Sequence, residues 1–238
     1  MSVIWHDLEC GAYAADMTLW RELADERGDP VLDVGAGTGR ITLDLARRGH
    51  RVTALDHDPG LIAELERRAA GLEVTTVIAD AREFALAERF PLIIVPMQTI
   101  QLLGGERGRL EFLACARRHL APAGGLVAIA ISEMLELYSM EDGVAVPIPD
   151  IRELDGIVYS SQPTAVREDG EGFVLERLRE TVAVDGERSA EQDVIHLDRL
   201  SAGTLEAEAA EVGLDPYRRH EIPPTTDHVG SVVVMLRG

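Results

Sequence analysis

Hydrophobic and polar positions follow a regular order in the first half of the chain. Between residues 31 and 132, short apolar runs alternate with segments in which apolar residues recur at helical spacing. This order predicts parallel strands joined by helices, as in an α/β sheet that helices cover on both faces. The predicted strands are 31–34, 51–56, 73–80, 91–97 and 126–132, and the predicted helices are 40–48, 60–70 and about 106–120.

The pattern changes after residue 132. Turn-rich segments that contain Asp-Gly now separate three strand-like runs, at 156–166, 172–184 and 190–200. Such runs predict an antiparallel meander. A helix then begins after Ser201 and ends at Gly213. The strands 217–223 and 231–237 have no helix-length segment between them, so we expect them to pair antiparallel at one edge.

These elements together define a fold class. We predict an α/β fold with a Rossmann-like, doubly wound and mostly parallel sheet of seven strands. The last strand is antiparallel, and the antiparallel β-meander is an insertion late in the sheet. At 238 residues, the chain is most simply one domain with this elaboration.

The charge balance narrows the range of partners. The chain holds 42 acidic and 23 basic side chains, which give a formal charge of −19 at pH 7. Such a molecule repels the phosphates of nucleic acids and of anionic membranes, so we expect neither as a partner. The chain contains no lysine, which excludes a lysine Schiff base and a phosphate-loop lysine.

Cysteine usage and the N-terminus bear on location. Cys10 and Cys115 form no paired motif, so we expect neither a disulfide framework nor a metal site. The N-terminus carries acidic residues where a leader would be basic and apolar, and no apolar run approaches membrane-spanning length. We therefore expect a cytoplasmic protein.

The segment VLDVGAGTGR, residues 31–40, places three glycines at alternate positions after the first predicted strand. Such a turn lets a ligand approach bare backbone. The dinucleotide fingerprint G-x-G-x-x-G would require glycine at position 40, where Arg40 stands. This difference disfavours a nicotinamide or flavin dinucleotide. Asp33, placed in the turn, suits an ammonium or sulfonium better than an anion, although alone it could be an ordinary turn residue.

Three later segments join this turn in a resemblance. The chain resembles class I S-adenosylmethionine-dependent methyltransferases in VLDVGAGTGR, in ALDHD, in IADARE and in PLIIVPM, in that order. The resemblance implies a single methyltransferase domain over 1–238, with S-adenosylmethionine as cofactor and S-adenosylhomocysteine as product. Its segments would be an N-terminal helical cover at 1–29, a cofactor-binding core at 30–132, the antiparallel insertion as a lid at 133–200, and a final helix with edge strands at 201–238.

The resemblance also assigns cofactor contacts. Asp56, at the end of the second strand, would accept hydrogen bonds from both ribose hydroxyls, and charged acceptors form the stronger hydrogen bonds. Asp80 would bind the adenine amino group, with the Ala81 backbone and His57 flanking the ring. Taken alone, Asp80 could cap a helix, and Asp56 could cap the next one, although Asp58 is better placed. The predicted cofactor residues are Asp33, Gly35, Ala36, Gly37, Gly39, Asp56, His57, Asp80, Ala81 and Pro96.

The methyl acceptor is predicted from the fourth strand and from the insertion. The sequence VPMQ differs from the (D/N/S)-P-P-(Y/F/W) signature of enzymes that methylate exocyclic amino groups on DNA bases or glutamine. Together with the negative charge, this difference favours a small-molecule acceptor. The insertion resembles the lid of small-molecule N-methyltransferases, including those that act on nucleotide-linked amino sugars and on glycine-type amines. We therefore expect nitrogen in preference to oxygen as the acceptor atom.

Tyr13 and His196 are the candidate catalytic residues. Tyr13 resembles an aromatic residue that family members place near the methyl group, but it could equally be a packing aromatic on an amphipathic helix. His196 could accept a proton or could be a partly exposed strand residue. Gln98, Glu133 and Tyr138 follow the fourth and fifth strands, where the walls of an acceptor site should lie.

Two other functions stay open on these residues. A non-catalytic S-adenosylmethionine-binding protein, acting as a sensor or as the partner of another protein, needs the same cofactor site. A dinucleotide oxidoreductase is less favoured because of the residue at position 40. The residue pattern indicates no particular oligomeric state.

Overall fold

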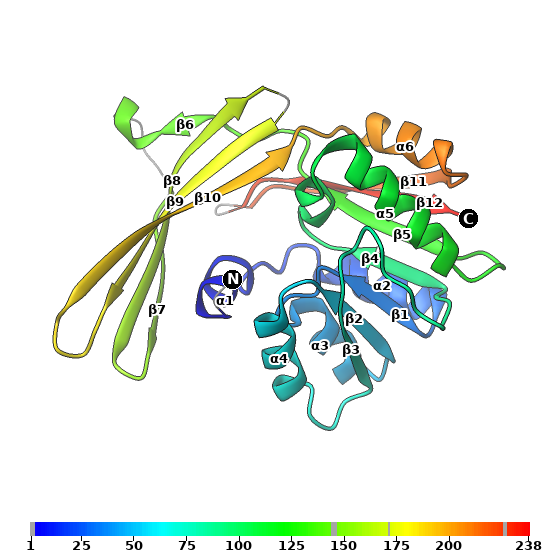
Figure 1. Cartoon of the computed structure of the whole chain (residues 1–238), viewed down its shortest axis with the longest axis horizontal. Helices are drawn as coiled ribbons and strands as arrows, with labels where there is room; N and C mark the ends of the chain where they lie inside the picture. Colours follow the sequence, from blue (N-terminus) through cyan, green and yellow to red (C-terminus); the bar gives the residue numbers. More distant parts are fainter. Residues whose placement is uncertain (1–2, 144–146, 171, 226–227) are drawn as a thin grey trace. The chain divides into compact units, whose positions relative to one another are not determined.

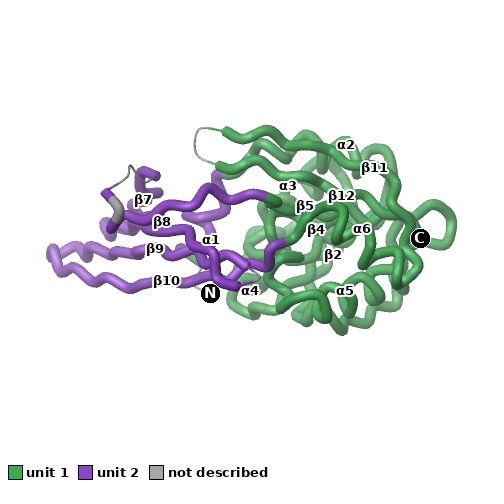
Figure 2. The backbone as a smooth tube through the Cα atoms, turned by 90° about the horizontal axis from the view of Figure 1, so that it is seen from above, with its two compact units in different colours: residues 1–3, 13–133, 200–238 green, residues 4–12, 134–199 purple. Residues whose placement is uncertain are grey.

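The computed structural model describes residues 3–143, 147–170, 172–225 and 228–238 (Figure 1). The chain divides into two compact units, which Figure 2 colours separately. The first unit comprises Tyr13–Glu133 and Leu200–Gly238, and the second comprises Ile4–Ala12 and Met134–Arg199. Each unit joins segments that are distant in the sequence, and the predicted segment boundaries stay predictions.

One sheet organises the first unit. Its strands are β1 (Val31–Val34), β2 (Val52–Asp56), β3 (Val74–Ile78), β4 (Leu92–Val95), β5 (Leu126–Ile131), β11 (Asp215–Ile222) and β12 (Ser231–Arg237). Their order across the sheet is β11-β12-β5-β4-β1-β2-β3. The strands β1 to β5 pair parallel, whereas β12 is antiparallel to β5 and β11 is antiparallel to β12. This arrangement confirms the predicted fold class and the predicted antiparallel pair at one edge.

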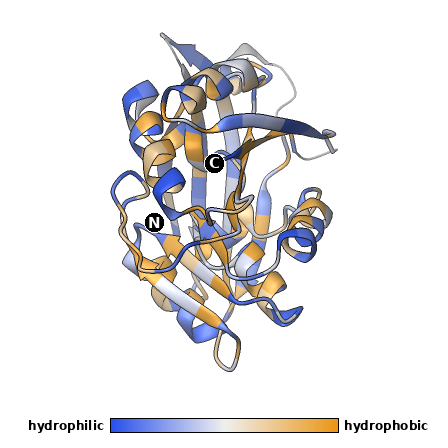
Figure 3. Cartoon of the chain, turned by 90° about the vertical axis from the view of Figure 1, so that its right-hand side faces the viewer, coloured by the Kyte–Doolittle hydropathy of each residue, from blue (hydrophilic) through white to orange (hydrophobic). Residues whose placement is uncertain are grey.

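Helices cover both faces of this sheet. They are α2 (Met17–Arg27), α3 (Arg40–Arg47), α4 (Pro59–Arg68), the 3-10 helix η1 (Thr99–Leu102), α5 (Gly105–His119) and α6 (Ala202–Glu211). One apolar core joins the sheet to α5 and α6, and a second joins it to α2 and α3. Every residue of β1, β4 and β5 is buried, as expected of inner strands covered on both faces. Figure 3 shows hydrophobic and hydrophilic residues on the same helices, which bury one side each.

Helix starts follow the predicted capping residues. Asp58 caps α4 by accepting hydrogen bonds from the backbone N–H groups of Gly60 and Leu61, at 2.8 and 3.2 Å. Ser201 caps α6 by accepting a hydrogen bond from Thr204 N at 3.0 Å. Within the described residues, none of the helices has both the length and the apolar character needed to cross a membrane.

An antiparallel sheet forms most of the second unit. Its strands are β6 (Tyr138–Ser139), β7 (Asp150–Leu154), β8 (Ile157–Asp169), β9 (Gly172–Val182) and β10 (Arg188–Asp198), and a 3-10 helix η2 (Met140–Asp142) follows β6. The three long strands confirm the predicted meander, but β6 and β7 are additional to it, each paired with β8. The strand β6 has two residues and all of β7 is exposed. Neither carries the alternation on which strand prediction depends.

Helix α1 (Val3–Cys10) is joined to that sheet by buried charges. Glu9 accepts hydrogen bonds from Arg179 Nε and Nη2, each at 2.8 Å, and from Ser161 Oγ at 2.7 Å. Arg179 also donates to Asp193 at 2.7 Å. The side chains of Glu9 and Arg179 are 5% and 8% exposed. The second unit therefore relies on an ion pair that is largely shielded from water.

Candidate functional site

The predicted cofactor residues gather where the parallel strands of the first unit end. Strand order reverses at β1, because β2 and β3 continue on one side of it while β4 and β5 lie on the other. Open α/β sheets bind ligands at the carboxyl ends of strands beside such a reversal. The turn Gly35–Gly39 follows β1, Asp56 ends β2 and Pro96 follows β4. The structure therefore places these three features at one edge of the sheet.

The turn after β1 depends on its glycines. The backbone angle φ is +74° at Gly35, +55° at Gly37 and +96° at Gly39, values that other residues rarely adopt. A Cβ atom at position 35 would lie 2.5 Å from Thr99 Cγ2, and one at position 39 would lie 2.3 Å from Leu65 Cδ1. Conformation and space both require glycine at these two positions. Thr99 packs against the turn, a contact that the sequence pattern does not indicate.

Asp56 links the turn to β2. Its Oδ2 accepts a hydrogen bond from Gly37 N and its Oδ1 accepts one from Asp58 N, both at 2.9 Å, and the residue is 7% exposed. Asp56 therefore does not cap α4, a role that Asp58 fills. A carboxylate offers about four acceptor positions, so about two remain for hydroxyl donors of a ligand. This capacity fits the predicted contact with a ribose.

Asp33 belongs to the predicted strand 31–34, although its chemistry was interpreted as that of a turn residue. It is the third residue of β1 and not part of the turn, and it is fully buried. Thr42 Oγ1 donates a hydrogen bond of 2.6 Å to Asp33 Oδ2, while Oδ1 has no hydrogen-bond partner among the described residues. Burial raises the pKa of Asp33 to about 6, against the opposing effects of the Thr42 hydrogen bond and the charge of Arg40, and the neighbouring carboxylate of Asp56 adds to the rise. The strand continues through this position because α3 supplies a partner for the carboxylate.

Of the residues predicted beside the adenine, His57 is exposed, whereas Asp80 and Ala81 are half-buried. Asp80 accepts hydrogen bonds from the backbone N–H and the guanidinium of Arg82, and these lower the pKa of Asp80 to about 2. The turn that follows Asp80 is not a helix, so Asp80 does not act as a helix N-cap. The side chain of His57 is 86% exposed, and its Nδ1 lies 3.4 Å from Asp56 Oδ1. The contact between the Ala81 backbone and the adenine ring stays a prediction.

The connection after β4 is strained. Met97 has φ of +56°, an uncommon value for a residue with a side chain and one that concentrates at functional sites. The buried Pro96 precedes it, and Pro96 O accepts a hydrogen bond of 3.0 Å from Thr99 Oγ1. Strand β4 ends at Val95, two residues before the predicted end. No periodic pattern in the sequence reveals a single residue of this kind.

The three predicted wall residues have separate surroundings. Gln98 Nε2 donates to Ser132 Oγ at 3.0 Å, which joins the ends of β4 and β5. Glu133 Oε1 accepts a hydrogen bond of 2.5 Å from Ala202 N, so this carboxylate satisfies the N-terminus of α6. Tyr138 lies in β6 of the second unit, where burial raises the pKa of its hydroxyl while the charge of a nearby arginine opposes the rise. Gln98 and Glu133 thus lie at the same sheet edge as the turn.

Tyr13 also lies at this edge, in the segment between α1 and α2 and not on a helix. Its ring centroid is 4.9 Å from that of His228, and its hydroxyl forms a hydrogen bond with the side chain of Ser231. Ser231 begins β12, and because β12 runs antiparallel to β5, it lies at the carboxyl end of β5. Burial raises the pKa of Tyr13, the Ser231 hydrogen bond opposes this, and the charges of Asp16 and Arg40 act in opposite directions.

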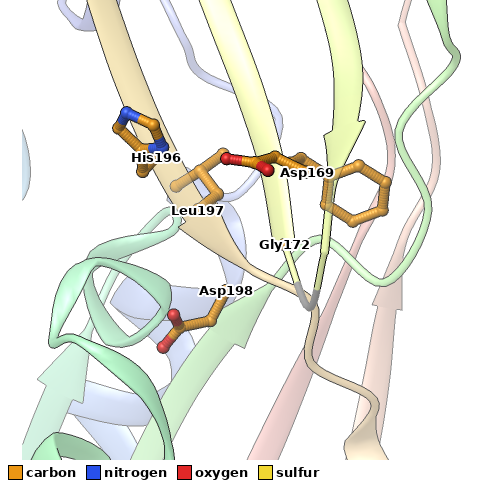
Figure 4. A pocket seen from close by; sticks show the side chains of 6 residues that line it. Asp169, Gly172, His196, Leu197 and Asp198 are labelled. Carbon is orange, nitrogen blue, oxygen red and sulfur yellow. The ribbon is translucent and has the colours of Figure 1, made fainter.

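His196 belongs to the second unit and lies on an exposed position of β10. The next residue, Leu197, is buried, so the His196 side chain points to the opposite face of the strand. A pocket of about 230 Å³ is lined by Asp169, Gly172, Phe173, His196, Leu197 and Asp198, and Figure 4 shows these side chains. Among the residues that the structure describes, no group of three or more His, Cys, Asp or Glu side chains is arranged to hold a metal ion.

Comparison with known sequences gives matches over part of the chain. Residues 31–124 match a family described as a methyltransferase domain. A probable cobalt-precorrin-6B C(15)-methyltransferase (decarboxylating) from Methanothermobacter thermautotrophicus is 35% identical over 120 residues, which are 48% of this chain and 59% of that protein. A cypemycin N-terminal methyltransferase from Streptomyces is 31% identical over 97 residues, 41% of this chain and 40% of that protein. The chain thus spans about half the length of these relatives.

Solved structures match nearly the whole chain. The sugar N-methyltransferase KedS8 from Streptoalloteichus gives a TM-score of 0.73 at 20% identity, covering 99% of this chain and 92% of that one. CalS10, an amino pentose methyltransferase from Micromonospora echinaspora with S-adenosylmethionine bound, gives 0.72 at 19% identity, covering 99% and 97%. At such identities, the similarity shows a shared fold.

Proposed function

We propose that this chain, which has a methyltransferase domain at residues 31–124 and the overall fold of S-adenosylmethionine-dependent methyltransferases, transfers a methyl group from S-adenosylmethionine to a small molecule. The family match over residues 31–124 supports the predicted type of domain. The observation that carries the proposal is the turn Gly35–Gly39 closed by Asp56 at the carboxyl edge of β1 and β2. The product would be S-adenosylhomocysteine.

The residues of the turn fit this cofactor. Asp56 keeps acceptor capacity for the ribose hydroxyls after binding Gly37 N and Asp58 N. With a pKa of about 6, Asp33 is mostly ionised at pH 7, and its Oδ1 lacks a partner among the described residues. A buried carboxylate beneath the turn stabilises a positive charge above it. Asp80, Ala81 and Pro96 stay the proposed contacts to the rest of the cofactor.

The chain's own side chains would chiefly position the reactants. When bound, S-adenosylmethionine supplies an electrophilic methyl group on a positively charged sulfur. The acceptor must present a lone pair in line with it, so positioning accounts for much of the rate. Because its pKa is raised, the Tyr13 hydroxyl is neutral at pH 7, and it can orient an acceptor without removing its proton. We propose His196 as the proton acceptor, with an exposed imidazole on β10.

We further propose that the acceptor atom is nitrogen and that the acceptor is an amino sugar or a glycine-type amine. The names of the structural relatives KedS8 and CalS10 support this class, since one is a sugar N-methyltransferase and the other an amino pentose methyltransferase. The ends of β4 and β5, with Gln98 and Glu133, would form its wall in the first unit, and Tyr138 in β6 stays a predicted wall residue. A cytoplasmic location agrees with the cysteine usage, because Cys10 and Cys115 form no paired motif.

The test is a methyl-transfer assay with matched acceptors. The purified chain is incubated with S-adenosylmethionine and pairs of compounds that differ only in an amino or a hydroxyl group, including nucleotide-linked amino sugars. We expect methylated amine and little methylated alcohol, and less product with Asp56→Ala when S-adenosylmethionine is below saturation. Preferential methylation of the alcohols contradicts the choice of nitrogen. Binding of S-adenosylhomocysteine without product from any pair would favour the non-catalytic, S-adenosylmethionine-binding alternative.

A further inference from the structure

Arg40 directly follows the glycine turn and begins α3, yet its side chain does not extend into solvent. The side chain is only 10% exposed. Its Nη1 lies 2.6 Å from Asp16 Oδ1 and its Nη2 lies 2.8 Å from Asp16 Oδ2, so the pair is bidentate. The Asp16 side chain is 2% exposed. A paired guanidinium and carboxylate with this geometry hold each other in a fixed orientation.

The same guanidinium holds Tyr13. Arg40 Nη1 donates a hydrogen bond of 2.9 Å to Tyr13 O, and its central carbon lies 5.2 Å from the centroid of the Tyr13 ring. Asp16 in turn accepts a hydrogen bond of 2.8 Å from Trp20 Nε1, and Trp20 is fully buried in α2. Arg40 therefore fixes both the backbone and the ring of Tyr13 from a firm anchor.

The two ends of this chain of contacts lie in the proposed site. At one end, Gly39 N donates to Ala36 O at 2.9 Å, so the backbone that leads into Arg40 is part of the glycine turn. At the other end, Tyr13 meets His228 and Ser231 at the carboxyl edge of the sheet. A change in the turn must therefore move the group that holds Tyr13.

We propose that Arg40 is a positioning residue that couples occupation of the glycine turn to the placement of Tyr13. This inference rests on the proposed function, because the ligand that occupies the turn is taken to be S-adenosylmethionine or its product. It also gives a role to the residue that stands where the dinucleotide fingerprint has glycine. In a dinucleotide-binding turn, that position is a small residue against the strand. In this chain the position is Arg40, whose guanidinium contacts Tyr13.

Coupling of this kind is reciprocal. If a ligand in the turn stabilises the segment of Tyr13 by some factor, that segment must strengthen binding of the ligand by the same factor. Coupling between sites commonly amounts to about fivefold or more. Removing the guanidinium should therefore weaken S-adenosylhomocysteine binding and abolish ligand-dependent ordering of the segment by matching factors. A purely structural ion pair would lower stability without linking these two quantities.

The experiment is hydrogen exchange, read by mass spectrometry on a peptide from residues 13–20 of the full chain, with and without saturating S-adenosylhomocysteine. In this peptide, Met17 N and Trp20 N are hydrogen-bonded to Ala14 O and Asp16 O, so their exchange reports order. Calorimetry on the same samples gives the affinity and establishes saturation. The variants are Arg40→Met and the milder Arg40→Lys, which keeps the charge but loses the fork, with Asp16→Asn as the partner change.

Arg47→Met is the matched control, because Arg47 lies on the same helix and is exposed. In the wild-type chain and in Arg47→Met, we expect the ligand to slow exchange about fivefold or more. In Arg40→Met, the ligand should bind about fivefold more weakly and no longer protect the peptide, with Arg40→Lys intermediate.

Equal protection in wild type and in both Arg40 variants would overturn the coupling and leave the proposed function intact. The same holds if calorimetry shows binding to wild type without any protection. Failure of folded wild-type chain to bind S-adenosylhomocysteine would overturn both the coupling and the proposed function. If Arg40→Met does not fold, the comparison of Arg40→Lys with Arg47→Met decides.

Discussion

Two buried carboxylates, Asp33 in the first unit and Glu9 in the second, have opposite surroundings. In the first unit, burial raises the pKa of Asp33 to about 6, and one of its oxygens has no partner among the described residues. In the second unit, burial also opposes ionisation of Glu9. There, hydrogen bonds from Arg179 and Ser161, with the charge of Arg177, bring the pKa of Glu9 below its ordinary value.

We interpret Asp33 as a group that serves ligand binding and Glu9 as a group that stabilises the fold. A buried carboxylate with one unpaired oxygen destabilises the folded chain when ionised, and we propose that Asp33 is retained beneath the glycine turn because a bound ligand is positively charged. A carboxylate with a full set of donors contributes stability. The first unit is held by apolar cores on both faces of its sheet, and it can accommodate such a group. The second unit depends more on charge.

The largest expected effect concerns the turn. Gly35→Ala should abolish saturable binding of S-adenosylhomocysteine, because the added Cβ would lie 2.5 Å from Thr99 Cγ2 and φ is +74°. Gly104→Ala is the control, since its backbone is left-handed, with φ of +83°, and a Cβ there meets nothing within 4 Å. The control isolates the left-handed strain, about 1 kcal/mol of unfolding free energy. Binding that survives in Gly35→Ala would place the ligand away from the turn.

The next effect concerns the ion pair of the second unit. Arg179→Met removes the guanidinium that pairs with Glu9 and Asp193. This change should lower the free energy of local unfolding of helix α1 by roughly 3–5 kcal/mol. Hydrogen exchange of residues 4–10 measures this loss. The double variant Arg179→Met with Glu9→Gln should recover part of it, because the unpaired charge is gone. A loss no larger than that of an exposed ion pair would show that charge does not hold this unit.

Asp33→Asn should stabilise the chain, whereas Arg179→Met should destabilise it. Because the folded-state pKa exceeds the ordinary value, the folded chain binds the proton more tightly, so this carboxylate destabilises the chain fully above pH 6 and progressively less as the pH falls toward 4. At pH 7.5, the variant should therefore have a higher free energy of unfolding than wild type, by up to about 3 kcal/mol. Denaturant titration measures this difference. The variant should lose this advantage near pH 4. It should also bind S-adenosylhomocysteine no better than wild type.

The pH dependence of the second unit has the reverse sign. Since the pKa of Glu9 is lowered on folding, its contribution is present above the ordinary value near 4.5 and is lost as the pH falls through the lowered one. Hydrogen exchange of α1 should accelerate in acid. In the first unit, by contrast, protonation of Asp33 removes a destabilising charge as the pH falls. Parallel loss of order in both units on acidification would contradict the contrast between them.

The smallest expected effect concerns the exposed carboxylate at the site edge. Arg82→Met removes the guanidinium that lowers the pKa of Asp80. Because solvent screens the pair, the unfolding free energy should stay close to that of wild type. Affinity for S-adenosylhomocysteine should stay within about threefold of wild type, within the usual scatter of such exposed contacts. A much larger loss of affinity would mean that Arg82 itself contacts the ligand.

The parts of the site that follow from local rules could be predicted from the sequence. Alternate glycines after an apolar run define a turn with left-handed residues, and Asp56 follows at the end of the next strand. The caps Asp58 and Ser201 are equally local. These features depend on backbone conformation and on neighbours within a few residues, which composition and spacing encode directly.

The parts that depend on distant partners could not be predicted. Arg40 pairs with Asp16 across 24 residues, and Thr99 packs on Gly35 from another strand connection. Asp33 looked like a turn residue because its partner, Thr42, becomes a neighbour only when α3 packs on the sheet. Nothing in the local pattern marks Met97, whose left-handed backbone is set by its surroundings.

The central claim is that the turn and Asp56 hold S-adenosylmethionine, and calorimetric titration with S-adenosylhomocysteine tests it most directly. NAD and the variant Asp56→Ala serve as controls. We expect saturable binding of S-adenosylhomocysteine, none of NAD, and a loss of about 1.5 kcal/mol or more in Asp56→Ala, the usual worth of a hydrogen bond to a charged group. Failure of the folded chain to bind S-adenosylhomocysteine, or unchanged affinity in Asp56→Ala, would contradict the account.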